Sequence, residues 1–272
     1  MNQPGEINEE LAAHAFNLQS GTFDQSYQSD NIVQYKRQRV RMHLLHLLKP
    51  YSRILELNSG TGEDSIWFAK QGHYVHATDI SSGMLDRLKE KITLAGQEER
   101  ISQQLISFTQ LENLAPALPY DMVFSNFAGL NCTHELNKVL KSLSPIIKPG
   151  GLVTLVLLPR FCLWEFLLLF KGKFKPAFRR LFSHHGATAR VEGAYFKCWY
   201  YNPSYVIKEL KEQFELLSIE GLCTIVPPSY IEHFTEKHPR IHRFLVSWEE
   251  QLKNQWPWKY IGDYYIISLK KK

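Results

Sequence analysis

Strand-like and amphipathic segments alternate along the first 160 residues of the chain. Short segments with the pattern of strands occupy residues 53–57, 74–78, 101–108, 122–125 and 152–158. The last of these is a continuous apolar run, as in strands buried on both faces of a sheet. Between the segments, apolar positions recur at helical spacing. This alternation predicts a parallel sheet with helices on both faces.

The segments on either side of this alternation are less regular. Residues 1–30 are polar and mixed, which predicts a helix and a loose arm, and residues 32–48 predict a helix that closes at Pro50. Residues 160–202 have the character of an insertion: an apolar helix, a basic stretch and an aromatic strand. The rest of the chain predicts helices over 203–213 and 241–252 and strands over 214–220 and 264–269.

These segments predict an α/β fold: a Rossmann-like, mostly parallel sheet of seven strands, with helices on both faces and a cap insertion after the fifth strand. Residues 1–50 are expected to form an N-terminal helical arm and lid. Residues 51–272 are expected to form one elaborated domain, in which the insertion at 160–202 and a second segment at 222–260 make the cap.

Composition places the chain among ordinary globular proteins. It has 272 residues, 44% of them hydrophobic and 22% charged, so it can bury a substantial core. Its four cysteines are widely spaced and form no C-x-x-C pair, which argues against a zinc ribbon, a redox motif or a disulfide scaffold. The first thirty residues lack a basic start followed by an apolar run. We therefore expect no signal peptide and a cytoplasmic location.

Positive charge is concentrated in two segments. The chain has a net charge of +5. The three lysines at 270–272 and the five basic residues within 171–180 together contribute +8, so the rest of the chain has a net charge of −3. Nucleic acid is therefore not an expected partner. The stretch 161–180 combines aromatic residues with these bases. It favours a packed lid helix under a solvated basic loop, and weak contact with a membrane surface is the alternative.

Candidate binding residues follow the first two predicted strands. In an open parallel sheet, ligands bind beyond the carboxyl ends of the strands, where the strand order reverses. Gly60 and Gly62 let the backbone pass close to a ligand, and the helix after them offers free N–H groups. Glu56 ends the first strand and Asp79 the second. Two carboxylates at these positions suit a ligand with one cationic end and one ribose.

These residues lie in segments that resemble the motifs of class I S-adenosylmethionine-dependent methyltransferases. Residues 54–64 (ILELNSGTGED) resemble the first motif, an acid, a spacer and alternating glycines, and residues 76–85 (HATDISSGML) resemble the second-strand motif with its ribose-binding acid. Residues 120–127 (YDMVFSNF) resemble the fourth strand, and residues 143–152 the Pro-Gly-Gly turn into the fifth. The chain departs from the family at Asn58, where glycine is usual. A backbone N–H remains there, so binding is expected to survive.

The resemblance implies S-adenosylmethionine as the cofactor and assigns residues to its parts. Glu56 would face the amino end of the methionine moiety, and Asp79 would hold the ribose hydroxyls. The other implied contacts are Asn58, Gly60, Thr61, Gly62 and Asp64 along the methionine moiety, Ile80 and Met84 flanking the adenine, Gln110 and Leu111 at the adenine edge, Asn126 and Phe127 near the sulfonium, and Tyr27 and Arg37 over the cofactor or its carboxylate. Asp64 is equally well explained as a first-turn acid that favours the helix dipole.

Three further residues, Asn131, His134 and Arg160, are candidates for contact with the methyl acceptor. Arg160 follows the fifth strand and could hold an anionic group by a bidentate contact, or form a salt bridge within the insertion. His134 could act as a general base if it faces the cleft. No metal site is predicted, because His73 and His76 share no partner at metal-like spacing.

The sequence thus predicts a methyltransferase that acts on a small, hydrophobic or aromatic acceptor, in view of the many aromatic residues of the cap. Transfer from a sulfonium is an in-line displacement, so alignment and exclusion of water matter most and no catalytic residue is predicted. A nicotinamide-dependent oxidoreductase, a noncatalytic cofactor-binding module and an RNA methyltransferase that binds through residues 171–180 are the alternatives. The glycine loop has only two of the three glycines that a dinucleotide fold prefers.

Overall fold

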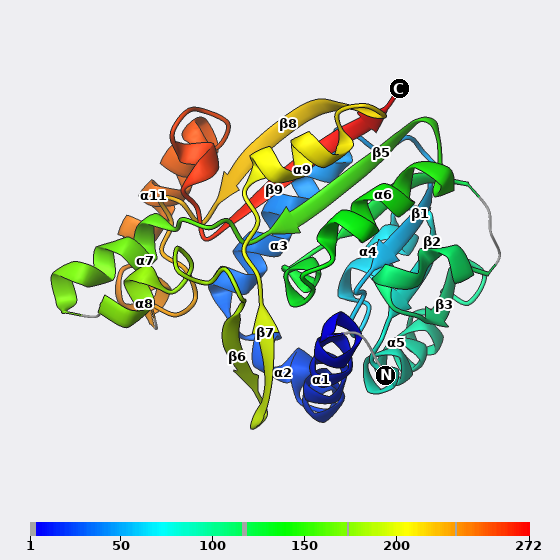
Figure 1. Cartoon of the computed structure of the whole chain (residues 1–272), viewed down its shortest axis with the longest axis horizontal. Helices are drawn as coiled ribbons and strands as arrows, with labels where there is room; N and C mark the ends of the chain where they lie inside the picture. The colour runs from blue at the N-terminus through cyan, green and yellow to red at the C-terminus, as the bar shows by residue number, and fades with distance from the viewer. Residues whose placement is uncertain (1–3, 116–118, 173, 232) are drawn as a thin grey trace.

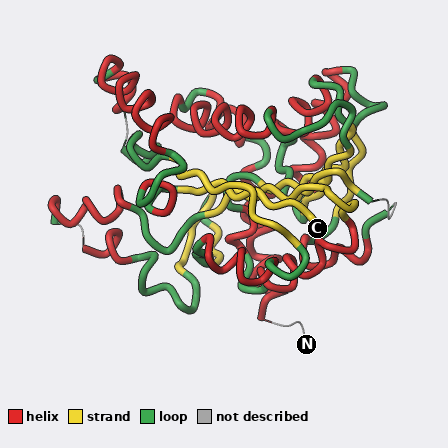
Figure 2. Tube along the Cα trace, turned by 90° about the horizontal axis from the view of Figure 1, so that it is seen from above, coloured by secondary structure: helices red, strands yellow, loops and turns green. Residues whose placement is uncertain are grey.

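The computed structural model describes residues 4–115, 119–172, 174–231 and 233–272, which form a three-layered α/β molecule (Figures 1 and 2). A seven-stranded sheet in the order β3-β2-β1-β4-β5-β9-β8 is the middle layer. Helices cover both of its faces, as Figure 2 shows. The predicted fold class, a Rossmann-like and mostly parallel sheet of seven strands, is confirmed.

The strands of this sheet are β1 (Arg53–Leu57), β2 (Tyr74–Asp79), β3 (Ile101–Leu105), β4 (Tyr120–Ser125), β5 (Ile147–Leu157), β8 (Phe214–Leu222) and β9 (Tyr264–Lys271). The first five are parallel, whereas β9 runs antiparallel to both of its neighbours, β5 and β8. From β1 the chain builds outward to β2 and β3, and then returns to place β4 on the other side of β1. The strand order therefore reverses between β1 and β4, which is where open α/β sheets bind ligands.

The helices that cover the sheet are α1 (Pro4–Gln19), α2 (Phe23–Gln28), α3 (Asn31–Leu45), α4 (Glu63–Lys70), α5 (Ser82–Ala95), α6 (Leu136–Ile146), α9 (Pro203–Leu210), α10 (Phe234–Lys237) and α11 (Pro239–Leu252), with 3₁₀ turns η1 (Phe108–Asn113), η2 (Gly129–Cys132) and η4 (Trp258–Tyr260). Side-chain caps fix two of the starts: Asp30 accepts from the backbone of α3, and Ser81 from that of α5. Within the described ranges, no helix has both the length and the apolar character needed to cross a membrane.

Residues 4–28 contain two helices, α1 and α2, so the predicted loose arm is wrong for the described part of this segment. Asp24 of α2 pairs with Lys91 of α5 (2.6 Å) and accepts a hydrogen bond from Thr61 (2.6 Å). These polar contacts hold α2 against the main domain although it buries none of its residues. Composition alone could not reveal them, because each partner is distant in sequence.

The chain leaves the sheet after β5 and forms α7 (Leu163–Leu167), η3 (Leu168–Lys171), α8 (Phe174–Phe178) and a hairpin of β6 (Ala187–Val191) and β7 (Ala194–Cys198). The predicted packed lid helix is wrong: the segment breaks into short pieces and leaves Phe170, Phe174 and Phe182 exposed by 84%, 65% and 76%. The predicted solvated basic loop is also wrong at Arg180, which is buried in ion pairs. Lys173 lies outside the described residues.

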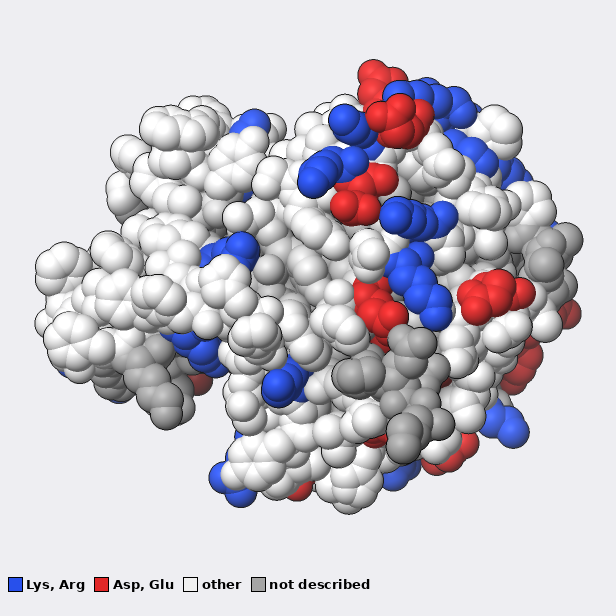
Figure 3. All heavy atoms as spheres, viewed as in Figure 1, with Lys and Arg blue, Asp and Glu red and all other residues white. Residues whose placement is uncertain are grey.

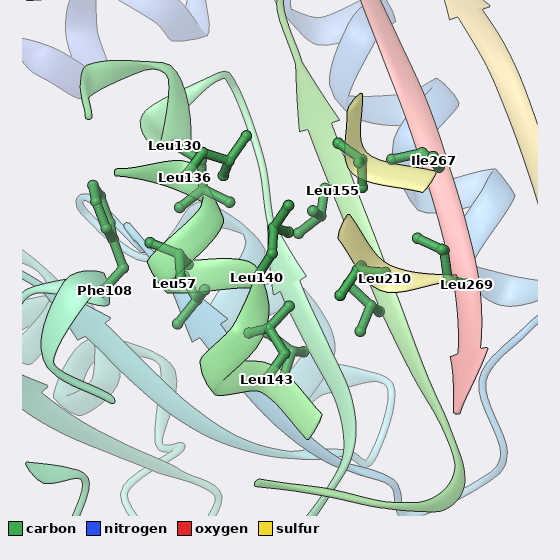
Figure 4. Packing of buried hydrophobic residues seen from close by; sticks show 14 of the residues in the cluster. Leu57, Phe108, Leu130, Leu136, Leu140, Leu143, Leu155, Leu210, Ile267 and Leu269 are labelled. Atoms are coloured by element: carbon green, nitrogen blue, oxygen red, sulfur yellow. The ribbon is translucent and has the colours of Figure 1, made fainter. Parts of the chain in front are cut away.

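Two hydrophobic clusters hold the layers together, one on each face of the sheet. Successive residues of a strand point to opposite faces, so Leu55 packs with α6 and α9, while Ile54 packs with α3, α4 and α5. Figure 4 shows the first cluster, in which Leu140 of α6 meets Leu155 of β5. Each fully buried side chain of this kind stabilises the fold by roughly 1.5–3 kcal/mol. The result is a rigid base for the loops at the carboxyl edge.

Candidate functional site

A cavity lies at the carboxyl ends of β1, β2 and β4, where the strand order reverses. The loops after these strands form one side of it, and α1, α2 and α3 form the other. The residues that line it are Glu9, Ala12, Phe16, Phe23, Arg37, Glu56, Asn58, Ser59, Gly60, Thr61, Glu63, Asp64, Asp79, Ile80, Met84, Phe108, Asn126, Phe127, Gly129 and Cys132. Most of the residues predicted to contact a cofactor are therefore brought together.

The loop after β1 keeps its shape through positive backbone φ angles. Asn58, Gly60 and Gly62 have φ of 47°, 55° and 78°. A Cβ at Gly62 would come within 2.1 Å of a side chain of α5, so packing requires glycine there, although Gly62 does not line the cavity. Asn58 uses its side chain as well as its backbone. Its Nδ2 donates to the carbonyl of Asn126 (2.9 Å) and its Oδ1 accepts from Ser125 Oγ (2.6 Å), which ties β4 to this loop.

Two buried carboxyl groups form one end of the cavity. Burial opposes ionisation of Asp64, but the guanidinium of Arg37 (2.9 Å) and a second arginine outweigh it and hold the pKa of Asp64 below its usual range. Asn126 also donates to Asp64 (2.8 Å). Burial and the neighbouring Asp64 raise the pKa of Glu56 to about 8. Within the described residues, the buried Nε of Arg37 has no hydrogen-bond partner.

Asp79 lies at the end of β2, between two loops. Its Oδ2 accepts from the backbone N–H of Gly60 (2.8 Å), and its Oδ1 from that of Ser81 (2.9 Å). Burial raises the pKa of this carboxyl, and the backbone donors oppose the rise. Each oxygen of an ionised carboxylate has a second lone pair. Asp79 is therefore held in place and can accept hydrogen bonds from two neighbouring hydroxyls of a ligand.

The other end of the cavity is apolar apart from one carboxyl group that the sequence did not reveal. Glu9 of α1 is 4% exposed, and its Oε2 accepts from the hydroxyls of Ser107 and Thr109 (2.9 Å for the latter). Within the described chain, its Oε1 is buried and without a hydrogen-bond partner. The spacing of Ala12 and Phe16 from Glu9 places all three on one helix face. This shared face is the feature of the sequence that could have indicated their common position at the cavity.

Neither of the two residues predicted at the adenine edge, Gln110 and Leu111, lines the cavity. β3 ends at Leu105, earlier than the predicted end at 108, so the residues that follow the strand are shifted. Phe108 lines the cavity instead, while Gln110 is exposed and Leu111 is buried in the hydrophobic cluster beneath. Ser107 could have indicated that the strand ends before it, because its side chain caps the 3₁₀ turn η1.

Tyr27 is also away from the cavity. Its ring packs on Phe23, with 4.6 Å between ring centroids, and Phe23 is the residue of α2 that lines the cavity. The two residues are one helical turn apart, so a sequence pattern does not show which of them faces inward. Arg37, predicted with Tyr27, does line the cavity.

The three predicted acceptor residues lie outside the cavity. Asn131 is fully buried, and its side chain binds the backbone of Leu158 and Trp199, so it joins η2 to the cap. His134 packs against Trp199 in a surface groove, with ring centroids 5.6 Å apart and the rings tilted by 40°. Arg160 donates to His184 (2.9 Å) in a second groove. The prediction of substrate contact is wrong for Asn131, because its polar atoms are already used.

The cavity suits an elongated ligand whose two ends differ in polarity. One end offers Glu56 and Arg37, the middle offers Asp79, and the far end is apolar with a single acceptor at Glu9. Over the part of the chain that the structure describes, no three His, Cys, Asp or Glu side chains are grouped so that they could hold a metal ion. The arrangement is one of positioning and charge rather than of nucleophilic side chains.

Residues 54–151 match the family described as Methyltransferase domain. The matched segment begins in β1 and ends in β5, so it contains Glu56, Asp79 and Asn126. α1, α2, α3 and the cap lie outside it.

Individual proteins show the same likeness. Demethylmenaquinone methyltransferase of Corynebacterium glutamicum is 31% identical over 119 residues, which are 44% of this chain and 45% of that protein. tRNA 5-carboxymethoxyuridine methyltransferase of Escherichia coli is 29% identical over 106 residues, 38% of this chain and 39% of that protein. The chain thus spans less than half the length of these curated relatives.

A solved structure extends the likeness to the whole fold. The 1,6-didemethyltoxoflavin-N1-methyltransferase of Burkholderia thailandensis superimposes with a TM-score of 0.59 at 12% identity, over 100% of this chain and 92% of that one. At this level of identity the superposition shows a shared fold.

Proposed function

We propose, from the match of residues 54–151 to the Methyltransferase domain family and from the residues that line the cavity, that this chain binds S-adenosylmethionine there and transfers its methyl group to a small-molecule acceptor. The observation that carries the proposal is the presence of Glu56 and Asp79 in one cavity, joined by the turn at Gly60. Each matches one polar part of that cofactor.

The side chains of the cavity fit the cofactor along its length. Glu56 would pair with the ammonium group, and the unpartnered Nε of Arg37 would donate to the carboxylate. Asp79 would accept from the two ribose hydroxyls, because its oxygens keep free lone pairs. Ile80 and Met84 would pack on the adenine ring. The bound cofactor supplies a methyl group that its sulfonium already activates.

The protein's part in the reaction is to orient the reactants and exclude water. Phe127 is fixed from both sides: its N–H donates to Asn126 Oδ1 (2.8 Å), and the guanidinium carbon of Arg37 lies 4.8 Å from its ring centroid. The helices α1 and α2 close the cavity on the side away from the sheet. Proximity and orientation of this kind lower a displacement barrier by several kcal/mol.

The acceptor that we propose is small and hydrophobic or aromatic. The cap carries many aromatic side chains, and the relative from C. glutamicum is named for demethylmenaquinone, an acceptor of this class. An RNA acceptor, for which the E. coli relative is named, is the second candidate. The weakly acidic charge of the chain outside two short segments disfavours it.

The proposal is tested by methyl transfer from radiolabelled S-adenosylmethionine to a panel of phenols, reduced naphthoquinones and total tRNA. We expect label in a small organic acceptor, and at least tenfold less with Asp79→Ala, because a charge-assisted pair of hydrogen bonds is lost. Gln110→Ala, an exposed change outside the cavity, is the matched control. Label in tRNA alone contradicts the small-molecule acceptor, and turnover of a nicotinamide without methyl transfer contradicts the whole proposal.

We also propose that the exposed aromatic residues after β5 touch an anionic membrane surface. Phe170, Phe174 and Phe182 lie beside the exposed bases Lys171 and Arg179. On the face drawn in Figure 3, the described side chains of the end that holds α7 and α8, at the left of Figure 1, are mostly uncharged. Apolar rings next to cations are the pattern of interfacial segments.

Co-sedimentation with vesicles checks this contact. We expect more protein to sediment with vesicles of phosphatidylcholine and phosphatidylglycerol than with phosphatidylcholine alone, and much less with the double variant Phe170→Ser and Phe174→Ser. Equal binding of this variant and the natural chain to the anionic vesicles would contradict the contact.

A further inference from the structure

The apolar end of the cavity contains one carboxyl group, that of Glu9, and only one of its two oxygens has a hydrogen-bond partner among the residues described. Glu9 comes from α1, which lies outside the methyltransferase-domain segment at 54–151. Its Oε2 accepts from the hydroxyls of Ser107 and Thr109. Its Oε1 is buried and has no hydrogen-bond partner among the residues described, and Glu9 itself lines the cavity.

A buried acceptor without a donor is costly. Leaving such a group unpaired costs about 1–3 kcal/mol, and more when the group is charged. Ala12, Phe16, Met84 and Phe108 line the cavity with Glu9, and none of them can donate a side-chain hydrogen bond. The thiol of Cys132 also lines the cavity, but it is hydrogen-bonded to Cys198. A ligand at this end should therefore bring a hydrogen-bond donor, held on the edge of an otherwise apolar body.

The position of Glu9 is fixed before any ligand arrives. Near the start of α1, Asn8 binds the backbone of Lys197 (2.8 and 3.1 Å) and the carbonyl of Cys132 (2.7 Å). Near its end, Asn17 Oδ1 accepts from Ser81 Oγ (2.7 Å) and from the N–H of Gly83 (2.8 Å). Figure 1 shows the consequence: α1 lies between the β6–β7 hairpin and α5.

We propose that Glu9 Oε1 accepts a hydrogen bond from the exocyclic amino group of the bound adenine, and that α1 thereby selects the purine. This inference rests on the proposed function, because it takes the ligand to be S-adenosylmethionine. An adenine ring offers what this end requires, two apolar faces and one amino group on its edge. A purine with an oxygen at the same position would meet the carboxylate oxygen acceptor to acceptor.

Calorimetric titration with two ligands tests the assignment. One is S-adenosylhomocysteine, and the other is S-inosylhomocysteine, in which hypoxanthine replaces adenine. We expect the natural chain to bind the adenine ligand at least thirtyfold more tightly. In Glu9→Gln the amide can donate to the hypoxanthine oxygen, so we expect the adenine ligand to lose tenfold or more and the preference to fall to threefold or less.

Two further variants separate this role from a structural one. Glu10→Gln changes the neighbouring exposed residue and should keep the natural preference. Thr109→Val removes one of the donors to Oε2 and leaves Oε1 unchanged, so it should reduce the preference for adenine only partly. This variant tests the proposal if Glu9→Gln does not fold. Thermal melts of each variant report whether the fold is intact.

The outcomes are distinguishable. If the natural chain binds S-adenosylhomocysteine and folded Glu9→Gln keeps both the affinity and the preference, the role of Glu9 is overturned while the proposed function stands. If the natural chain binds neither ligand, the proposed function fails and the role of Glu9 fails with it.

Discussion

At the scale of single residues, burial and neighbouring charges set the chemistry of the cavity. Glu56 and Asp64 are both buried carboxyl groups, yet their pKa values shift in opposite directions. Asp64 is paired with arginines of α3, whereas Glu56 faces the negative charge of Asp64. The sequence predicts both residues near a ligand, but it could not show which of them forms ion pairs, because the arginines come from another helix. Glu56 accepts a hydrogen bond from Ser65 instead.

Glu56→Gln should stabilise the folded chain above pH 8 and weaken cofactor binding. The raised pKa means that the folded state holds a proton on Glu56 which the unfolded chain releases above the usual pKa of 4.5. The folded state therefore binds more protons between pH 4.5 and about 8, and stability falls as pH rises through that range. We expect Glu56→Gln to melt higher than the natural chain at pH 8.5 and equally at pH 4.5. Parallel melting curves across this range would refute the shift.

Asn58→Gly should destabilise the fold even though glycine is usual at this position in the methyltransferases that the segment 54–64 resembles. Glycine relieves the positive φ, which is worth up to about 1 kcal/mol. It also deletes hydrogen bonds to Ser125 and Asn126, each worth about 0.5–1.5 kcal/mol, and leaves both partners partly buried. We expect a net loss of about 1–2 kcal/mol in urea unfolding. A glycine variant more stable than the natural chain would show that the backbone strain at Asn58 outweighs its two side-chain hydrogen bonds.

At the scale of elements, the periodic segments were predictable and the cap was not. Strands at 53–57 and 74–79 and the helix capped by Ser81 follow from local pattern. The cap breaks into α7, α8 and a hairpin because its stability comes from distant partners. Arg180 is the clearest case: it binds Asp263 (2.7 Å) and Glu165 (2.9 Å), two residues that no local pattern connects to it.

Arg180→Met should therefore disrupt the cap far more than the same change at the neighbouring arginine. It would leave the buried Asp263 with only the more distant Lys36 (3.8 Å) as a cationic partner, and the buried Glu165 with only Arg179, which costs about 3–5 kcal/mol. Arg179→Met is the control, because Arg179 is half exposed, and its ion pair is worth about 1 kcal/mol or less. Urea unfolding of the two variants measures the difference. Equal losses would mean that the buried network does not hold the cap.

At the scale of the whole molecule, the cavity has two sides of different origin. The loops that follow the strands form one side, and the helices α1, α2 and α3 form the other. The motifs predict that Glu56, Asp79 and Asn126 lie together, and all three line the cavity, because parallel strands bring their carboxyl ends to one edge of the sheet. Their contact with a cofactor stays a prediction. The contribution of α1 was not predicted, because the helical spacing of Glu9, Ala12 and Phe16 shows that they share one face but not what that face packs against. The predicted lid over residues 1–50 therefore stays a prediction about motion.

Hydrogen exchange tests that prediction. If α1 and α2 cover a bound cofactor, S-adenosylhomocysteine at a hundred times its dissociation constant should slow exchange of their amides by tenfold or more, because opening must then release the ligand. Amides of α11, which lies outside the cavity lining, serve as the internal control and should not change. Protection confined to the sheet loops would show that the arm does not close over the ligand.

The central claim is that this cavity binds S-adenosylmethionine, and titration calorimetry of the natural chain tests it most directly. S-adenosylhomocysteine and NAD⁺ are titrated separately at pH 8.5, where Glu56 is largely ionised. We predict saturable binding of one S-adenosylhomocysteine per chain and no heat from NAD⁺. Saturable binding of NAD⁺ with none of S-adenosylhomocysteine would contradict the claim.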